Sequence, residues 1–374
     1  MTTEYIVRIR NRAGIRQWDI TDFLGLNYSK FLNGWGVANV QLPNNHDAIT
    51  SLEKDGQIEI WRFDESADPP IAPYCDFFGL YRGRDRATPS GGSIHGVFTA
   101  KLVEQKHYLF RAVTGHPAGT TNRNDFDTIP TETIMKNLVK YNCTPSATLL
   151  DGRKRVPTWV NLISVAADTA QGATITKSFA HRKIDECLQE LAAVGGLDWD
   201  LVKTGLRTWE FRTGTWGSDL SDTVRFSLTW DNLDNPQLTS SDINEETVAM
   251  VWGQDSGVAR SFLEVHGPNY AADYNDIEVY IDAANQTDES LQASGDARMN
   301  EVRARDDFTA QVFQNGPFVY GRDYCTSGIL GDIVGVTYYE SSVAKRIRGA
   351  QVSVVTSSGG QKAETIQLDM VTAL

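Results

Sequence analysis

Cysteine is scarce in this chain of 374 residues. The four cysteines, Cys75, Cys143, Cys187 and Cys325, lie far apart, and no Cys-x-x-Cys pair occurs. A dense disulfide framework and a cysteine zinc site both need closer spacing, so the sequence indicates neither of them. We therefore expect free thiols, made in a reducing cytoplasm.

Long apolar runs are also missing. No run approaches the roughly 18 apolar residues that a membrane-spanning helix needs, so no stable membrane insertion is expected. The first residues, Met1–Tyr5, carry no basic stretch followed by an apolar one. The sequence thus predicts no signal peptide.

Motifs of catalysis and metal binding are absent as well. The six histidines never lie three or four residues apart, and no His-Glu-x-x-His, Gly-x-Ser-x-Gly, Gly-x-Gly-x-x-Gly or phosphate-binding loop occurs. With 48 acidic residues, pairs of carboxylates arise by chance and do not indicate glycosidase chemistry. The sequence predicts no catalytic residue, no metal site and no cofactor, and hence a protein that is not an enzyme.

Basic clusters are lacking too, and the formal net charge is −13. A nucleic-acid-binding protein normally presents a basic face. An acidic balance is common among soluble proteins, and it also suits a surface that DNA passes without binding, because like charges repel. Both interpretations stay open on charge alone.

Aromatic residues, by contrast, are plentiful at 10% of the chain, and glycines separate short apolar runs. This composition favours strands joined by turns, so the expected fold class is mainly β with α+β insertions. Helical periodicity predicts helices over 131–141 and 179–194, a short helix over 108–111, and a polar helix within 285–304. Strands are predicted over 5–10, 37–42, 56–63, 77–82, 97–103, 197–201, 208–212, 224–230, 247–253, 308–313, 333–338, 346–355 and 363–370.

A turn near the C-terminus is the most informative feature. The run 318–324 ends in Gly-Arg-Asp-Tyr and is followed by a second Gly-Asp pair before an apolar strand. Glycine and aspartate at such places satisfy the backbone angles of tight turns. We predict that five residues serve turn geometry: Gly321, Asp323, Tyr324, Gly331 and Asp332. The family resemblance described next implies that they also close a β-barrel.

Three segments in order carry a family resemblance. The chain resembles the Gp37-like tail protein group of siphophages in three segments. These are residues 102–111, the stretch from Asn232 through 248–253 to Arg260, and the run 318–336. The resemblance implies a ring-forming baseplate hub, similar to the hub of contractile-tailed phages and to the N-terminal part of tail-associated lysins. In such hubs, two β-barrels per subunit alternate in a trimer.

The resemblance also implies a domain organisation. It predicts a first β-barrel at 1–112, an α/β domain at 113–215, a second β-barrel at 216–256 and 307–374, and an inserted α/β segment at 257–306. In this interpretation, residues 248–260 lie beside 321–336 at the seam where the discontinuous second barrel closes.

The implied function is structural. The protein would sit at the distal end of a phage tail, adapt the sixfold tail tube to a threefold tip, and enclose a channel through which DNA passes without specific binding. The expected assembly is a homotrimer in the virion tail tip, after synthesis in the host cytoplasm. Its expected partners are the distal tail protein, the tail tube or tape-measure protein, and tip or fibre proteins.

Two alternatives stay open. A carbohydrate-binding or carbohydrate-active tail protein would need exposed aromatic rings, although aromatic strand residues more often pack in cores or cross-strand pairs. The candidates are Trp35, Trp159, Trp209, Trp216 and Trp252. The other alternative is a distal tail ring protein, against which the two helices of the middle region argue.

Overall fold

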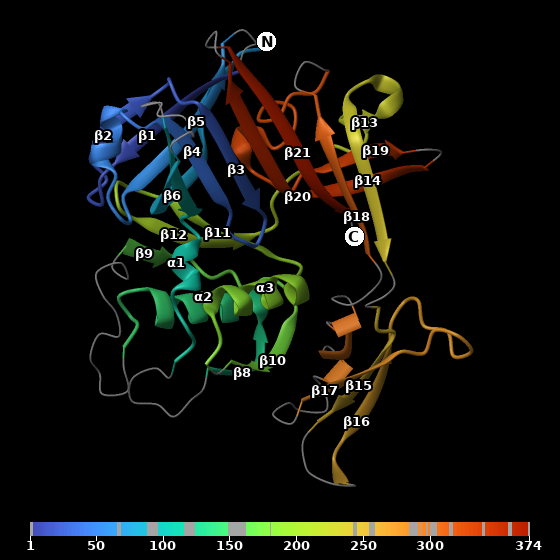
Figure 1. Cartoon of the computed structure of the whole chain (residues 1–374). Helices are drawn as coiled ribbons and strands as arrows, with labels where there is room; N and C mark the ends of the chain where they lie inside the picture. The colour runs from blue at the N-terminus through green and yellow to red at the C-terminus, as the bar shows by residue number, and fades with distance from the viewer. Residues whose placement is uncertain are drawn as a thin grey trace. The chain divides into compact units, whose positions relative to one another are not determined.

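The chain divides into two compact units (Figure 1). Unit 1 comprises Met1–His107, Trp216–Thr239 and Asp307–Leu374, and unit 2 comprises Tyr108–Thr215 and Ser240–Asp306. The computed structural model describes residues 3–65, 69–87, 96–115, 124–148, 162–179, 181–241, 245–253, 259–283, 291–292, 294–296, 298–299, 305–313, 317–338, 341–357 and 361–372.

One large sheet dominates unit 1. Its strands are β1 (Glu4–Arg10), β2 (Arg16–Ile20), β3 (Gly25–Phe31), β4 (Val37–Pro43), β5 (Gln57–Asp64), β6 (Ile71–Ala87), β7 (Val97–Glu104), β13 (Arg225–Ser227), β14 (Leu233–Ser241), β18 (Arg305–Val312), β19 (Ile333–Tyr338), β20 (Ser341–Thr356) and β21 (Lys362–Thr372). They follow the order β14-β18-β21-β20-β3-β4-β7-β6-β5-β1-β2, with β19 pairing with both β13 and β20.

The pairing of β3 with β20 joins the two ends of the chain. Gly25–Phe31 runs antiparallel to 349–355, so the sheet continues from the N-terminal strands into the C-terminal ones (Figure 1). The mainly β fold class is confirmed by this sheet. The organisation into two separate closed barrels stays a prediction.

The core of unit 1 follows from strand alternation. Successive side chains of a strand point to opposite faces. In β1, Tyr5, Val7 and Ile9 are at most 2% exposed, whereas the alternate residues Ile6, Arg8 and Arg10 lie on the other face. One continuous apolar cluster unites these residues with Val352 and Leu368 from the C-terminal strands. The core therefore depends on both ends of the chain.

The first part of unit 2 is a mixed α/β region. Its elements are β8 (Asp125–Pro130), α2 (Thr131–Cys143), β9 (Ile163–Val165), β10 (Thr174–Ser178), α3 (Ile184–Gly195), β11 (Asp198–Lys203) and β12 (Trp209–Gly214), and α1 (His107–Phe110) precedes them. The strands form the sheets β10-β8 and β11-β12-β9. The predicted hairpin is confirmed as the antiparallel pair β11–β12.

The two predicted helices of this region are present with altered bounds. Helix α2 extends two residues beyond the predicted 131–141. Helix α3 begins at Ile184, later than predicted, because His181 has a φ of +57° and Lys183 is extended. Gly196, with a φ of +61°, ends α3 by donating its N–H to Ala192.

The carboxylate of Glu132 fastens the start of α2 to two other segments. It accepts hydrogen bonds from the Thr169 hydroxyl at 2.8 Å, the Gln171 N–H at 2.7 Å and the Thr213 hydroxyl at 3.0 Å, and it pairs with Lys136. Burial raises the pKa of Glu132, but these donors outweigh burial and hold the pKa at about 2.

This depressed pKa predicts a pH-dependent stability. A carboxyl whose pKa is lower in the folded state than in the unfolded state stabilises the folded protein at pH values above its ordinary pKa of 4.5. This contribution is lost as the pH falls towards the folded-state pKa of about 2. We expect Glu132→Gln to lower the free energy of unfolding at pH 7 by roughly 1–3 kcal/mol. The deficit should shrink as urea unfolding is measured from pH 5 down to pH 3. The exposed Glu186 provides the control Glu186→Gln, and a deficit independent of pH would contradict the prediction.

The second part of unit 2 contains a separate three-stranded sheet. Strand β15 (Val248–Trp252) lies between β16 (Phe262–His266) and β17 (Glu278–Asp282), antiparallel to the former and parallel to the latter. The sequence placed 247–253 in the second barrel and beside the C-terminal turn, and this differs from the pairing observed. Among the described strands, β15 pairs only within its own sheet because both of its edges are occupied.

Two further predictions differ in detail. The strand predicted over 224–230 ends at Ser227, and Leu228–Trp230 forms a short 3-10 helix because the Ser227 hydroxyl accepts the Thr229 N–H at 3.1 Å. In the segment 285–304, where the sequence predicts a polar helix, the apolar residues Leu291 and Met299 are buried, and Val302 lies outside the described residues.

Candidate functional site

The predicted C-terminal turn is present at 318–324. The Gly321 N–H donates to the Tyr324 carbonyl at 2.9 Å, and the Asp323 carboxylate accepts the Val319 N–H at 2.7 Å. Gly321 has a φ of +82°, and a Cβ there would lie 2.2 Å from the Tyr74 hydroxyl. Only glycine satisfies both the backbone angle and the close approach. A 3-10 helix, Thr326–Gly328, follows before β19 begins.

Aromatic packing holds the turn in the core of unit 1. Tyr324 is fully buried, with ring centroids 5.9 Å from Tyr320 and 5.3 Å from Phe226. Both contacts are edge-on, the arrangement that aromatic quadrupoles favour. The turn is therefore anchored by its side chains as well as by its backbone.

Asp332 ties the turn to two neighbouring segments. Its carboxylate accepts the Cys325 N–H at 2.6 Å and the Ser218 N–H at 2.7 Å. Beside it, Gly331 has a φ of +116°, and a Cβ there would lie 2.5 Å from the Trp216 carbonyl oxygen. The five residues predicted from the sequence thus lie in this turn or just before β19. Their role in closing a barrel stays a prediction.

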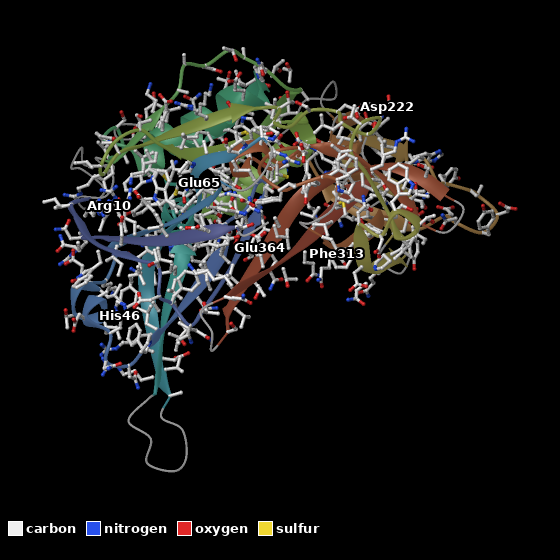
Figure 2. The ribbon with its side chains drawn as sticks, turned by 90° about the horizontal axis from the view of Figure 1, so that it is seen from above. Arg10, His46, Glu65, Asp222, Phe313 and Glu364 are labelled. Carbon is white, nitrogen blue, oxygen red and sulfur yellow. The ribbon has the colours of Figure 1, made fainter. Side chains whose placement is uncertain are left out.

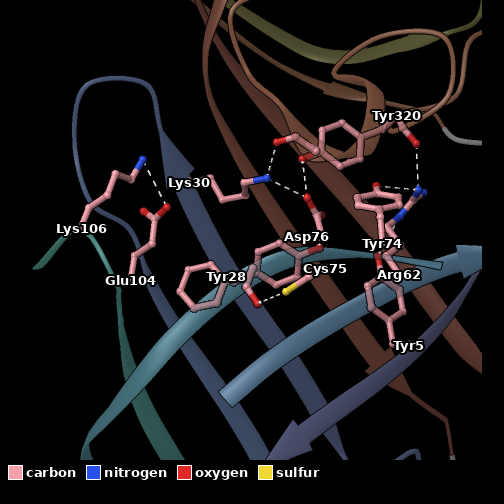
Figure 3. Close-up of polar contacts among 12 residues, drawn as sticks. Tyr5, Tyr28, Lys30, Arg62, Tyr74, Cys75, Asp76, Glu104, Lys106 and Tyr320 are labelled. Atoms are coloured by element: carbon pink, nitrogen blue, oxygen red, sulfur yellow. Dashed lines mark hydrogen bonds and ion pairs between the residues drawn. The ribbon is translucent and has the colours of Figure 1, made fainter. Parts of the chain in front are cut away.

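A buried ionic network beneath the turn was not predicted. It consists of Tyr5, Tyr28, Lys30, Arg62, Tyr74, Asp76, Tyr320, Gly328 and Glu364. Figure 3 labels all of these residues except Gly328 and Glu364. Its members come from β1, β3, β5, β6 and β21 and from the turn with its 3-10 helix. All of these segments belong to unit 1.

Arg62 is one centre of the buried ionic network. Its side chain is completely buried and forms a bidentate pair with Glu364, at 2.9 Å and 3.0 Å. Its third nitrogen, Nη1, donates to the Tyr320 carbonyl at 2.8 Å. Glu364 lies where the N-terminal strands meet the C-terminal strands (Figure 2). Arg62 therefore fastens the C-terminal turn and β21 to β5.

Asp76 is the second centre. It accepts hydrogen bonds from the Tyr28 hydroxyl at 2.5 Å, from Lys30 Nζ at 2.8 Å and from the Tyr320 hydroxyl at 3.1 Å. Lys30 also donates to the Gly328 carbonyl. Burial raises the pKa of Asp76, but the Lys30 ammonium, the Tyr28 hydroxyl and the Arg62 charge together outweigh burial and hold this pKa below its usual range. The aspartate thus stays charged and paired.

The buried ionic network holds the strands of unit 1 and the C-terminal turn together. Burial raises the pKa values of Tyr5, Tyr28 and Tyr320, which keeps their hydroxyls protonated as donors. Both carboxylates are engaged by cations and hydroxyls, as buried charges require. Across the described ranges, no group of three or more histidine, cysteine or acidic side chains is arranged to hold a metal ion.

A signal for this network existed in the sequence. In β5, Arg62 follows Ile58 and Ile60 at every second position, so it occupies an inward-facing place. A charged residue at such a place needs a buried partner. The partner, Glu364, is 302 residues away, and no local pattern identifies it.

The tryptophans proposed for carbohydrate binding fall into different environments. Trp209 is fully buried, and Trp35, Trp216 and Trp252 are partly exposed. Trp159 lies outside the described residues. In the part of the chain that the structure describes, no helix is long and apolar enough to span a membrane.

Unit 1 is thus a mainly β fold stabilised by a buried ionic network, with the predicted turn in place. Over residues 6–367 the sequence matches the family described as Siphovirus ReqiPepy6 Gp37-like protein. The chain belongs to this family. Among curated proteins, no sequence gives a significant match.

Solved structures share the fold over nearly the whole chain. The tail protein from Neisseria meningitidis MC58 aligns with a TM-score of 0.61 at 11% identity, covering 99% of this chain and 97% of that one. The 43 kDa tail protein of prophage MuSo2 from Shewanella oneidensis gives 0.60 at 11%, with 99% and 98% covered. A chain of the Francisella PdpA–VgrG complex gives 0.54 at 10%, covering 100% of this chain and 58% of that one.

At these identities the likeness shows the fold alone. The siphovirus family and the tail-protein fold together support a structural role in a phage tail and an association with the virion.

Proposed function

We propose that the protein is the baseplate hub at the distal end of a phage tail. In this proposal three copies form a ring that adapts the sixfold tail tube to a threefold tip and encloses the DNA channel. The main support for this proposal is the large sheet of unit 1, in which the N-terminal and C-terminal strands pair at β3–β20. The strand order of this sheet begins with β14 and ends with β2.

The two end strands, β2 and β14, supply the assembly surfaces. An edge strand presents backbone N–H and C=O groups that a strand of a neighbouring molecule can satisfy. Head-to-tail contacts of this kind close into a ring when the rotation allows it. Pro236 removes one donor from β14, whereas β2 contains no proline. Exposed Ile15 and Trp18, at 57% and 38%, flank the β2 edge with apolar surface.

The proposed trimer is tested by measuring the mass of the assembly and by imaging it. We expect the full-length protein to have the mass of three chains in light scattering and to show a ring with an axial hole in electron micrographs. Ile15→Asp should reduce the assembly to monomers. Leu206, 59% exposed in unit 2, provides the matched control, because Leu206→Asp should leave the trimer intact. A wild-type monomer with no ring at any concentration would overturn the hub proposal. A trimer that survives Ile15→Asp would remove β2 from the interface.

Charge supports a channel that DNA crosses without specific binding. Each copy carries a formal charge of −13, so three copies carry −39. Acidic walls repel the phosphate backbone and prevent DNA from adhering. Mapping the charged residues onto the imaged ring tests this part of the proposal, which a basic channel wall would contradict.

The partners proposed are the distal tail protein, the tail tube or tape-measure protein, and tip or fibre proteins. The structural likeness to a chain of a complex that contains PdpA and VgrG supports a protein that works within a larger assembly. Affinity isolation of assembled particles, followed by cross-linking, would identify the neighbours on each face.

A further inference from the structure

The small sheet of unit 2 has two unlike faces. One face packs Ala249, Val251 and Val265 against Leu291 and Met299 in an apolar core. The strand register places the side chains between them on the opposite face. That opposite face carries Val248, which is buried, and Met250, Trp252, Phe262, Glu264, His266, Glu278, Tyr280 and Asp282.

Aromatic rings gather at one end of this opposite face. Trp252 and Phe262 are directly paired across β15 and β16, with ring centroids 4.8 Å apart. Phe262 is 43% exposed and Tyr280, on the far strand, is 59% exposed. Neighbouring exposed rings form an apolar patch, and contiguous patches often mark ligand-binding sites.

Arg260 links the Tyr280 side chain to the backbone of β15. It donates to the Tyr280 hydroxyl at 3.1 Å and to the Trp252 carbonyl at 3.1 Å, and it pairs with Asp282. The ring platform is therefore preorganised, which lowers the entropy cost of binding a ligand.

The platform continues along β16 into a polar hollow. Phe262, Glu264 and His266 follow one another at every second position over roughly 14 Å. His266 stacks on Tyr270, with ring centroids 3.8 Å apart and planes 23° apart. Tyr270 in turn lines a hollow of about 410 Å³, together with Glu245, Pro268, Asn269, Tyr274 and Asn275.

The hollow presents fixed polar groups beside an exposed ring. The Glu245 side chain belongs to a residue that is 6% exposed, and its two oxygens accept the Nδ2 groups of Asn269 at 2.6 Å and Asn275 at 3.2 Å. This pairing turns each amide nitrogen towards Glu245, so each amide oxygen faces away from it. Tyr274, beside them, is 82% exposed.

We propose that this surface, defined by Trp252, Phe262, Tyr280, His266 and the hollow around Glu245, binds an uncharged oligosaccharide. The negative faces of aromatic rings attract the polarised C–H bonds of a sugar ring. Sugar hydroxyls are both donors and acceptors, and they match the carboxylates and amide oxygens along the strip. An extended strip that ends in a hollow suits a chain of several sugar units.

Charge selects this class of ligand over others. The strip and hollow carry the four carboxylates Glu245, Glu264, Glu278 and Asp282, against the single guanidinium of Arg260. Nucleic acids and anionic polysaccharides are repelled by such a surface. The cores of protein–protein interfaces are depleted in aspartate and glutamate, and here carboxylates alternate with the rings. A neutral oligosaccharide therefore fits the surface better than a polyanion or a protein partner does.

Binding is tested with the full-length protein and three neutral probes, cellohexaose, maltohexaose and chitohexaose, at up to millimolar concentration in titration calorimetry. We expect at least one probe to bind. Phe262→Ala and Tyr280→Ala should each weaken binding about tenfold or more, the effect of losing one stacked ring. Phe262→Tyr should retain binding because it keeps the ring. Trp230 in unit 1, 55% exposed, gives the control Trp230→Ala, which should bind as the wild type does.

Four outcomes would overturn the proposal: none of the three probes binds; only an anionic heparin hexasaccharide binds; Phe262→Ala and Tyr280→Ala bind as tightly as the wild type; or Phe262→Ala loses its assembly, which would make this face a protein interface. The mass of each variant is measured alongside, so a failed oligosaccharide site and a failed hub proposal give different results.

Discussion

Replacing Arg62 with methionine is expected to lower the free energy of unfolding by roughly 3–5 kcal/mol. The substitution keeps the apolar volume but leaves Glu364, whose side chain is 8% exposed, without its guanidinium partner. It also removes the donor to the Tyr320 carbonyl, and with it the link between β5 and the C-terminal turn. An uncompensated buried charge is the largest part of the loss.

Urea unfolding followed by circular dichroism measures this effect. Protein concentration must be held constant, because assembly adds to apparent stability. The double variant Arg62→Met with Glu364→Gln should recover part of the stability, since the stranded charge is then gone. The control is Arg12→Met, because the Arg12–Glu53 pair is 63% and 34% exposed and surface pairs contribute little. Equal losses for Arg62→Met and Arg12→Met would contradict the role assigned to the buried ionic network.

Gly331→Val is expected to destabilise the fold by roughly 2–6 kcal/mol, enough to prevent folding or assembly. The φ of +116° is a backbone conformation that only glycine adopts readily. The added Cβ would also lie 2.5 Å from the Trp216 carbonyl oxygen and 2.9 Å from its carbon. Backbone atoms cannot rotate away as a side chain does, so the segment at 216–217 must shift.

The control for Gly331 is Gly196, at the end of α3. It also has a positive φ, +61°, but nothing lies within 4 Å of an added Cβ. Gly196→Val should therefore lose about 1–2 kcal/mol, from the backbone angle alone. The thermal midpoint and the mass of both variants are compared with those of the wild type. A Gly331→Val protein as stable as Gly196→Val, and assembled normally, would show that the close approach at the turn is unimportant.

Local patterns predicted much of the fold. The strands at 5–10 and 56–63 are confirmed within one residue because alternation along a strand is a local property. The helix at 131–141 is confirmed because one apolar stripe suffices to define it. The strand at 224–230 was half wrong because the Ser227 hydroxyl accepts the Thr229 N–H and favours a turn of 3-10 helix there.

Of the candidate site, only the C-terminal turn was predicted from the sequence. Gly321, Asp323 and Asp332 were identified from turn chemistry; Gly321 has a positive φ, and both aspartates accept backbone N–H groups. The buried ionic network was missed because its decisive pairs join distant residues, as Arg62 and Glu364 do. Nothing near either residue in the sequence indicates which opposite charge it will meet.

The sequence by itself determined the mainly β class, the helices of the middle region, the C-terminal turn and the family. Each of these depends on residues close together along the chain, where periodicity and backbone preference act. Only the tertiary structure decided that β3 pairs with β20, that β15 belongs to a separate sheet, and that Arg62 meets Glu364. The β3–β20 and Arg62–Glu364 contacts join segments about 300 residues apart, and β15 must select its partners from among many strands of similar pattern. Such choices are made only when the whole core packs at once.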